Sequence, residues 1–249
     1  MKIAVITAMP EESRAVADGL GSAGKRQMGE ISACRFNFAG HLILLAESGM
    51  GFDNAAMAAK ALIHDGAPDL LISTGFCGGI DPELLSGDVV VAKSIVIAKE
   101  GSYEEIPALF SPVCQAFVTR QRSEGNRTVE GTFVSTPEIM QKRSLAAVLP
   151  GHYTNPVVEM ESAAVAIIAA ENNIPLVAIR AVSDPAAEEL KFSLNEFCDP
   201  EMRRINPYKV LATILKRPYI VPQLIRLSRG SSRAAGSLTD VFPRLFQMF

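Results

Sequence analysis

Four of the charged side chains in the apolar stretch between residues 157 and 185 stand out by their positions. Arg180 lies inside an apolar run of strand length, Asp184 follows that run, and Glu159 and Glu161 precede an alanine-rich segment. A lone buried charge is very costly, so Arg180 needs an acid or an anion beside it. A carboxyl group in such a cluster can donate a proton at neutral pH when burial or a neighbouring carboxylate raises its pKa. These residue types therefore indicate acid–base chemistry.

The elements around these charges are predicted to bring them to one edge of a sheet. Residues 161–172 are expected to form a helix, and residues 176–182 a strand that is apolar on both faces. Ligands of open α/β sheets bind outside the carboxyl ends of the strands, where Asp184 would lie. The alternative is purely structural, with acids that stabilise a helix N-terminus and an arginine held in an internal ion pair.

The first acids of the chain are predicted at the same edge. Residues 2–7 form a strand, and Pro10 begins a helix whose first turn holds two glutamates, the second being Glu12. Acids in a first turn interact favourably with the helix dipole, which is one role for them. The other role follows from position, because Glu12 lies at a strand's carboxyl end and can meet Arg180 on the edge that carries Asp184.

Two glycine-rich segments, residues 48–54 and 74–80, follow strand-like runs. Glycines let backbone N–H groups come close to an anion or a sugar. The first segment has no following Gly-Lys-Ser/Thr and lacks the third glycine of a dinucleotide fingerprint, so it matches neither phosphate-binding motif. Two such turns at one sheet edge predict a cleft where the backbone approaches a ligand.

Strand-like and helix-like segments alternate along the chain, which predicts an α/β fold with helices on both faces of a mixed, mostly parallel central sheet. The 249 residues, 48% of them hydrophobic, suffice for one large or two small domains. Besides the elements above, we expect a hairpin at 26–48, strands at 68–73, 89–97 and 128–135, and helices at 55–64 and 137–148.

Composition narrows the classes of function. The net charge of −3 gives no indication of nucleic acid binding. Four cysteines and three histidines are scattered without the spacing of a metal site, which favours reduced thiols in a cytoplasm. The N-terminus reads as a strand and not as a signal peptide, and no apolar run has the length of a membrane span.

The segment 216–249 differs from the rest, with six basic residues, one acid and interleaved large apolar residues. Arg226, Arg229 and Arg233 fall on one helical face. One interpretation is a helix packed on the domain or at a subunit contact. The other is a basic amphipathic helix lying on an anionic membrane surface, such as the inner face of the cell membrane. We therefore expect a catalytic domain, 1–215, followed by this extension.

Five motifs carry a family resemblance: MKIAVITAMPEE, ESGMG, STGFCGGIDPELLSGDVVV, VVEMESAAVA and AIRAVSDPA. In these motifs the chain resembles the purine nucleoside phosphorylase/uridine phosphorylase superfamily, and within it the nucleosidases that cleave methylthioadenosine and S-adenosylhomocysteine. The resemblance implies a three-layer α/β/α sandwich around a mixed, barrel-like sheet. It also implies a small-molecule nucleoside substrate, no cofactor or metal, and a homodimer or higher homo-oligomer.

The resemblance also implies roles for single residues. Asp184 would protonate N7 of the leaving purine, a step worth roughly 10²–10⁴-fold in rate. Glu12 would hold and activate the attacking water, and Glu161 would accept hydrogen bonds from the ribose hydroxyls. Arg180 and Ser183 would support the water site and Asp184. The other residues expected at the substrate are Glu159, Met160, Met9, Met50, Gly78, Phe76 and Ile139.

The attacking group is expected to be water and not phosphate. The phosphorylases of this superfamily carry a Gly-Asp-Pro-x-Arg run after the first strand and an arginine before the second glycine cluster. The corresponding runs here are AMPEES and LISTGFCGG, which lack both arginines. The carboxylate of Glu12 would also repel phosphate. Arg14 and Arg180 keep phosphorolysis as the alternative.

Three departures from the compact nucleosidases leave the substrate open. Ile139 or Met140 stands where those enzymes stack the base on a phenylalanine, Phe76 replaces a small residue, and the basic tail is additional. The alternatives are a hopanoid-associated nucleosidase or phosphorylase acting on an adenosyl lipid, and a futalosine hydrolase. A non-catalytic nucleoside-binding protein and a peripheral membrane protein are the other classes considered.

Overall fold

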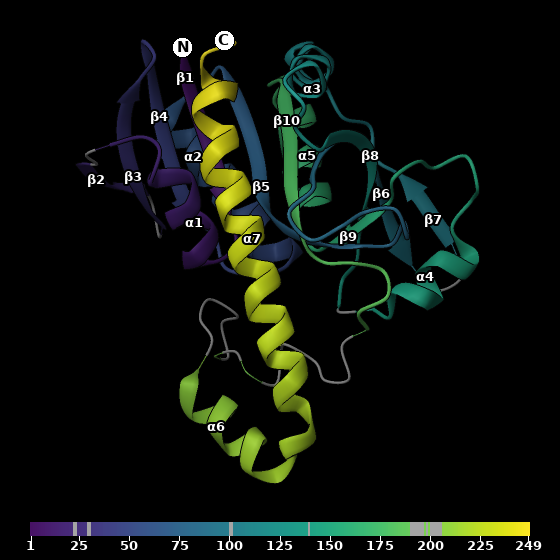
Figure 1. Cartoon of the computed structure of the whole chain (residues 1–249). Coiled ribbons are helices and arrows are strands. Elements are labelled where there is room, and N and C mark those ends of the chain that lie inside the picture. The colour runs from purple at the N-terminus through teal and green to yellow at the C-terminus, as the bar shows by residue number, and fades with distance from the viewer. Residues whose placement is uncertain are drawn as a thin grey trace.

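The computed structural model describes residues 1–21, 24–28, 31–99, 102–138, 140–189, 197, 199 and 206–249 (Figure 1). Ile139 lies outside the described residues. The elements in chain order are β1 (Lys2–Thr7), α1 (Pro10–Ala17), β2 (Gly24–Met28), β3 (Ile31–Phe38), β4 (His41–Glu47), α2 (Phe52–Gly66), β5 (Leu70–Gly79), β6 (Val89–Lys99), β7 (Ser102–Glu105), α3 (Val113–Ser123), β8 (Thr128–Ser135), α4 (Lys142–Val148), β9 (Val157–Glu159), α5 (Ser162–Glu171), β10 (Leu176–Asp184), α6 (Pro207–Lys216), the short 3₁₀ helix η2 (Pro218–Ile220) and α7 (Val221–Phe246).

The described strands form one mixed sheet that closes on itself. In its centre, β4, β1, β5 and β10 pair in parallel. From β10 the pairing continues through β6, β8 and β9 back to β5, which makes the ring-like part of the sheet. Five of the described pairings are parallel and five antiparallel, so the described sheet is mixed and not mostly parallel. Because β1, β5 and β10 pair in parallel, their carboxyl ends lie at the same edge.

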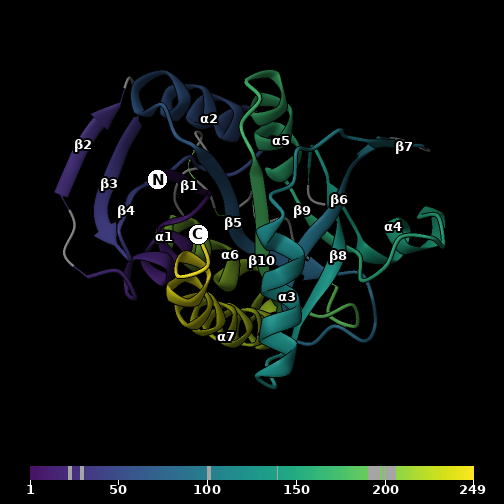
Figure 2. The ribbon, with the colours of Figure 1, turned by 90° about the horizontal axis from the view of Figure 1, so that it is seen from above.

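Helices cover both faces of the sheet and bury two separate apolar clusters, as Figure 2 shows from above. On one face, alanines of α2 and α5 pack against Ala4 and Ile6 of β1. On the other, α1, α3 and α7 pack against Ile3 and Val5 of the same strand. Alternate residues of β1 thus face opposite layers, as the period of a strand requires. The predicted α/β/α sandwich is confirmed.

Two local expectations were wrong at their boundaries, and one short strand was missed. The turn expected at 74–80 is largely strand, because β5 continues to Gly79 in register with β10. The helix expected at 137–148 begins only at Lys142. The short β9 was not predicted; it joins β5 and β8 and places Glu159 at the sheet edge.

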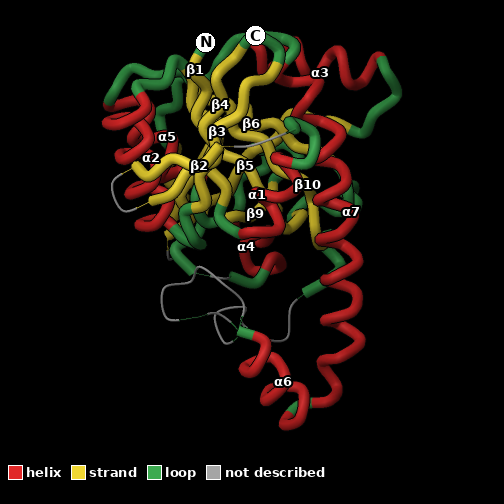
Figure 3. The backbone as a smooth tube through the Cα atoms, turned by 90° about the vertical axis from the view of Figure 1, so that its left-hand side faces the viewer, coloured by secondary structure: helices red, strands yellow, loops and turns green. Residues whose placement is uncertain are grey.

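The long helix α7 has two different halves. From Ala234 to Phe246 its apolar side chains are buried in the cluster beneath the sheet. Its first half extends beyond the strands and carries α6 at its far end (Figures 1 and 3). Gly230 marks the crossing, because a Cβ built there would overlap the carbonyl oxygen of Ser183 in β10. None of the described helices is both long and apolar enough to span a bilayer.

Candidate active site

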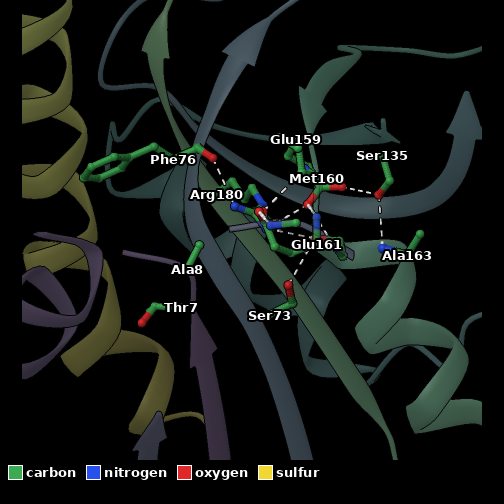
Figure 4. Close-up of polar contacts among 12 residues, drawn as sticks. Thr7, Ala8, Ser73, Phe76, Ser135, Glu159, Met160, Glu161, Ala163 and Arg180 are labelled. Carbon is green, nitrogen blue, oxygen red and sulfur yellow. Dashed lines mark hydrogen bonds and ion pairs between the residues drawn. The ribbon is translucent and has the colours of Figure 1, made fainter. Parts of the chain in front are cut away.

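Four charged residues from three separate parts of the chain converge at the carboxyl edge of the sheet. Glu12 comes from the first turn of α1, directly after β1. Glu159 ends β9, and Glu161 is the residue before α5. Arg180 lies in β10 and forms ion pairs with Glu159 and Glu161 (Figure 4). The convergence predicted from the isolated charges in the sequence is therefore present.

Arg180 is the centre of this carboxylate cluster. Its side chain is 2% exposed. Nη2 lies 2.7 Å from Glu159 Oε2 and 3.0 Å from Glu161 Oε2, and Nη1 donates to the carbonyl oxygen of Phe76 at 3.0 Å. Burial disfavours the charged guanidinium, but the carboxylates of Glu159 and Glu161 outweigh it and the pKa of Arg180 is raised. The guanidinium therefore stays charged and fixes the acids around it.

Glu12 is buried and held by backbone donors. Its Oε2 accepts from the N–H groups of Ala8 and Met9, each at 2.9 Å, and its Oε1 accepts from Phe76 N–H at 2.7 Å. Burial raises the pKa of Glu12 to about 7, against the opposing effect of Arg180. A carboxyl with such a pKa exchanges protons near neutral pH, which suits a group that activates water.

Gly75 of β5 provides the space between Glu12 and Arg180. A Cβ built on it would lie 2.5 Å from Glu12 Oε1 and 2.8 Å from Arg180 Nη1. Any larger residue would have to displace one of the two charged groups. The second glycine cluster of the sequence is thus explained by close approach of side chains, and it is part of the strand, not a turn.

Glu161 and Glu159 occupy the entrance to α5 in different ways. Glu161 accepts from the backbone N–H of Gly51 at 2.8 Å, which ties the first glycine-rich segment to the cluster. Glu159 accepts from the N–H groups of Glu161 and Ser162 at 3.0 and 2.7 Å, and from the hydroxyl of Ser135. Burial raises the pKa of Glu161 against the effect of Arg180. Glu159 therefore positions the helix entrance, and Glu161 links the Gly51 backbone to Arg180.

Asp184 ends β10 beside this cluster. The register between β10 and β5 shifts between Val182 and Asp184, as in a β-bulge, which re-aims the side chain that follows. Ser183 Oγ lies 2.6 Å from Asp184 Oδ1 and 3.2 Å from the carbonyl oxygen of Cys77. Burial raises the pKa of the Cys77 thiol. The charge of Arg180 opposes this rise and the charge of Asp184 adds to it, so both groups lie near the thiol.

Lys142, at the start of α4, was not among the predicted residues. Its side chain is 6% exposed, and Nζ lies 2.7 Å from Asp184 Oδ2. The same Nζ donates to the carbonyl oxygens of Asp184 and Pro185 at 3.2 and 2.7 Å. Burial raises the pKa of Asp184, and Lys142 opposes the rise. The lysine stands in a polar, helix-forming segment of the sequence, where nothing distinguishes it from a solvated side chain.

The remaining predicted residues lie at the site in different ways. Met9 contributes its N–H to Glu12, and Met50 and Met160 are half-buried beside the glycine and glutamate segments. Gly78 would bring a Cβ 3.1 Å from Asp184 Oδ2. Phe76 joins the cluster only through its backbone, because its ring packs in the apolar cluster that includes α7 (Figure 4). Arg14 is exposed on α1, outside the carboxylate cluster.

Comparison with known proteins shows to which family the chain is similar. The family model described as Phosphorylase superfamily matches residues 2–215. A 5'-methylthioadenosine/S-adenosylhomocysteine nucleosidase of Bacillus cytotoxicus is 33% identical over 216 residues, covering 80% of this chain and 92% of the relative. That of Bacillus thuringiensis subsp. konkukian is 32% identical over 213 residues, with the same coverage.

Solved structures agree in fold. The 5'-methylthioadenosine/S-adenosylhomocysteine nucleosidase of Neisseria meningitidis, in complex with methylthio-immucillin-A, has a TM-score of 0.74 at 22% identity, covering 100% of this chain and 99% of that chain. Futalosine hydrolase of Helicobacter pylori has a TM-score of 0.75 at 16% identity, covering 100% and 98%. The family model and the curated relatives together confirm the resemblance seen in the motifs: the chain belongs to the phosphorylase superfamily.

Proposed function

We propose that this protein is a nucleosidase that hydrolyses the N-glycosidic bond of an adenosine-type nucleoside to a free base and a free ribose derivative. The observation that carries the proposal is the presence at one sheet edge of two acids, Glu12 and Asp184, whose pKa values are raised by burial. The names of the 5'-methylthioadenosine/S-adenosylhomocysteine nucleosidases support the same reaction.

Asp184 would act on the leaving base. Cleavage leaves an electron-rich purine, and protonation at N7 makes it a better leaving group. Burial raises the pKa of Asp184, so the carboxyl can keep a proton to donate. Ser183, 2.6 Å from Oδ1, and Lys142, 2.7 Å from Oδ2, hold the carboxyl from both sides. Lys142 is thus a positioning residue for the general acid.

Glu12 and Glu161 would act on the sugar side. In its ionised form Glu12 would hold the attacking water and take its proton. Glu161, fixed by Gly51 and Arg180, would accept hydrogen bonds from the ribose hydroxyls. Negative charge at this edge also stabilises the oxocarbenium-like charge that develops on the ribose. Acid, water and sugar would then lie on the same edge of the sheet.

Water is the better nucleophile for this site than phosphate. Phosphate-binding sites rely on arginines and backbone N–H groups. Here the Nη atoms of Arg180 are engaged by two carboxylates and a backbone carbonyl, and the exposed Arg14 lies outside the cluster. The three acids Glu12, Glu159 and Glu161 would repel an anion. This arrangement supports hydrolysis over phosphorolysis.

A substrate test separates the enzyme from a binding protein. The purified protein is incubated with 5'-methylthioadenosine, S-adenosylhomocysteine and adenosine, and free base is measured by chromatography. We expect base release by the native protein and a loss of at least about 10²-fold with Asp184→Asn. Calorimetry should show that this variant still binds nucleoside. Tight binding without turnover by the native protein would instead identify a non-catalytic nucleoside-binding protein.

We also propose a homodimer or higher homo-oligomer, as the family resemblance implies, and a cytoplasmic location. The described cysteines Cys34, Cys77 and Cys114 are free thiols, in keeping with a reducing compartment. Mass photometry of the purified protein tests the oligomeric state, with a dimer mass expected and a monomer mass at all concentrations contradicting it.

A further inference from the structure

Residues 206–229, comprising α6, η2 and the first half of α7, form a small lobe beyond the end of the sheet; we name it the distal lobe (Figures 1 and 3). It has an apolar core of its own, in which Ile220 is buried with Phe197, while Val210, Leu224 and Leu227 pack around them. The inward apolar side chains of α6 and of the first half of α7 are therefore buried by contacts with one another. The outward side chains of the lobe are exposed.

The outer face of the distal lobe is apolar and exposed. Tyr208, Leu211 and Leu215 recur at helical spacing on one side of α6, with 81%, 55% and 77% of their surfaces exposed. Tyr219 of η2 is 68% exposed, and Ile225 of α7 is 47% exposed. Half of the large hydrophobic side chains found exposed in the described protein lie in this lobe. Such a concentration marks an interaction surface.

Charge decides what kind of partner fits this surface. Residues 206–229 include five lysines and arginines and no aspartate or glutamate. Lys216 directly follows Leu215 on α6. Arg226 and Arg229 follow Ile225 on α7, and these three cationic side chains are exposed. Apolar and tyrosine side chains bordered by cations match the boundary between the acyl chains and the headgroups of an anionic membrane. A two-fold contact between copies of the chain would instead bring cations against cations.

The distal lobe is firmly attached to the catalytic part. The second half of α7 is buried beneath the sheet, and Gly230 lies against the Ser183 carbonyl, next to Asp184. The lobe lies on the side of the molecule to which the carboxyl ends of β1 and β10 point (Figure 1). A surface bound by the lobe would therefore face the edge of the sheet that carries the carboxylate cluster.

We propose that the distal lobe docks on an anionic phospholipid surface, with Leu211, Leu215 and Tyr219 entering the headgroup region and Lys216, Arg226 and Arg229 contacting lipid phosphates. The membrane interpretation of the sequence placed this contact in 216–249. The structure assigns it to 206–229, because the later apolar residues of α7 are buried in the core. The docking does not depend on the proposed nucleosidase activity.

Vesicle co-sedimentation of the full-length protein tests the docking. Vesicles of phosphatidylcholine alone are compared with vesicles of phosphatidylcholine and phosphatidylglycerol in equal parts. We expect pelleting with the anionic vesicles only. The partition coefficient should fall at least tenfold in an apolar variant, Leu215→Ser with Tyr219→Ser. It should fall as much in a charge variant, Lys216→Gln with Arg226→Gln and Arg229→Gln.

Two matched controls use exposed residues elsewhere. The apolar control is Leu85→Ser with Leu109→Ser, and the charge control is Arg35→Gln with Lys60→Gln and Lys93→Gln. Both should pellet like the native protein, and thermal melting should show all variants folded. Equal pelleting with neutral vesicles, no pelleting at all, or equal loss in the controls would overturn the proposal. So would a fall in oligomer mass in the apolar variant without vesicle binding, because the face would then join copies of the chain.

Discussion

At the scale of single residues, the site contains acids whose pKa values are raised by burial. In each case the charge of a neighbouring cation lowers the pKa and so limits the rise. Arg180 restrains Glu12 and Glu161, and Lys142 restrains Asp184. The two acids proposed for catalysis thus interact with different cations, Glu12 with Arg180 and Asp184 with Lys142. Protonation of one acid therefore leaves the interaction of the other with its cation in place. Because their roles need opposite protonation states, the pH dependence of the reaction should report both.

The pH profile of kcat/KM is predicted to be bell-shaped. The pKa of Glu12 is raised to about 7, and Glu12 must be ionised to accept the proton of water, so activity should fall as the pH drops below about 7. Asp184 must be protonated, so activity should also fall as the pH rises through the raised pKa of Asp184. Steady-state kinetics across the pH range check this. A profile that stays flat from acid to neutral pH would contradict the role of Glu12.

Replacing Lys142 is predicted to move the limb of that profile that depends on the Asp184 proton. Lys142 lowers the pKa of Asp184, so Lys142→Met should raise that pKa and shift this limb to higher pH. The rate maximum should fall as well, since Asp184 loses an anchor. Lys60→Met, which removes an exposed lysine of α2, is the control and should change neither. An unchanged limb in Lys142→Met would mean that the lysine is only structural.

At the scale of elements, the site depends on where β10 meets α7. The bulge at Ser183 aims Asp184, and α7 crosses directly over the Ser183 carbonyl at Gly230. Ser86 Oγ donates to the same carbonyl at 3.0 Å. Helix α7 is therefore part of what holds Asp184, the proposed general acid, in place, although α7 lies beyond residue 215, where the family match ends.

Alanine substitutions at two glycines of α7 test the contact between α7 and β10. Gly230→Ala should destabilise the protein by about 1–3 kcal/mol, because its Cβ would overlap the Ser183 carbonyl and α7 would have to shift. Gly236→Ala is the matched control, with nothing near its Cβ, and should stabilise the helix by about 0.5–1 kcal/mol. Urea unfolding of both variants measures the difference. Equal stabilities would show that α7 does not press on β10.

The sequence allowed the site to be predicted where a residue contrasted with its surroundings. Arg180 and Asp184 stood out because their neighbours are apolar, and Glu12 because it follows a strand at the same edge. Lys142 did not stand out, since a lysine among polar helical residues looks solvated and only the tertiary fold buries it. The direction of the Phe76 ring was equally hidden, because the sequence does not show to which face a residue near a strand end turns.

At the scale of the whole molecule, α7 joins two regions with different solvent exposure. Phe242, Leu245 and Phe246 are fully buried under the sheet, whereas Ile225, on the same helix, is 47% exposed in the distal lobe. Of the two interpretations of the basic tail, packing on the domain is therefore correct for the second half of α7. The membrane interpretation is retained as a proposal for the distal lobe alone.

Truncating side chains at the two ends of α7 should have unequal effects. Phe242→Ala should cost about 3–5 kcal/mol of unfolding free energy, because it leaves a cavity in the core. Ile225→Ala removes an exposed side chain and should change stability by no more than about 0.5 kcal/mol. Urea unfolding checks both values. A small effect of Phe242→Ala would mean that the end of α7 is not part of the core.

The central proposal is that water, activated at the carboxylate cluster, cleaves a nucleoside that is protonated on its base. Its most direct test is cleavage of 5'-methylthioadenosine in ¹⁸O-labelled water without phosphate, with the sugar product analysed by mass spectrometry. The predicted result is free adenine and a methylthioribose that carries ¹⁸O at C1. Cleavage only after phosphate is added, with a sugar 1-phosphate as the product, or no cleavage of any adenosine-type nucleoside, would contradict it.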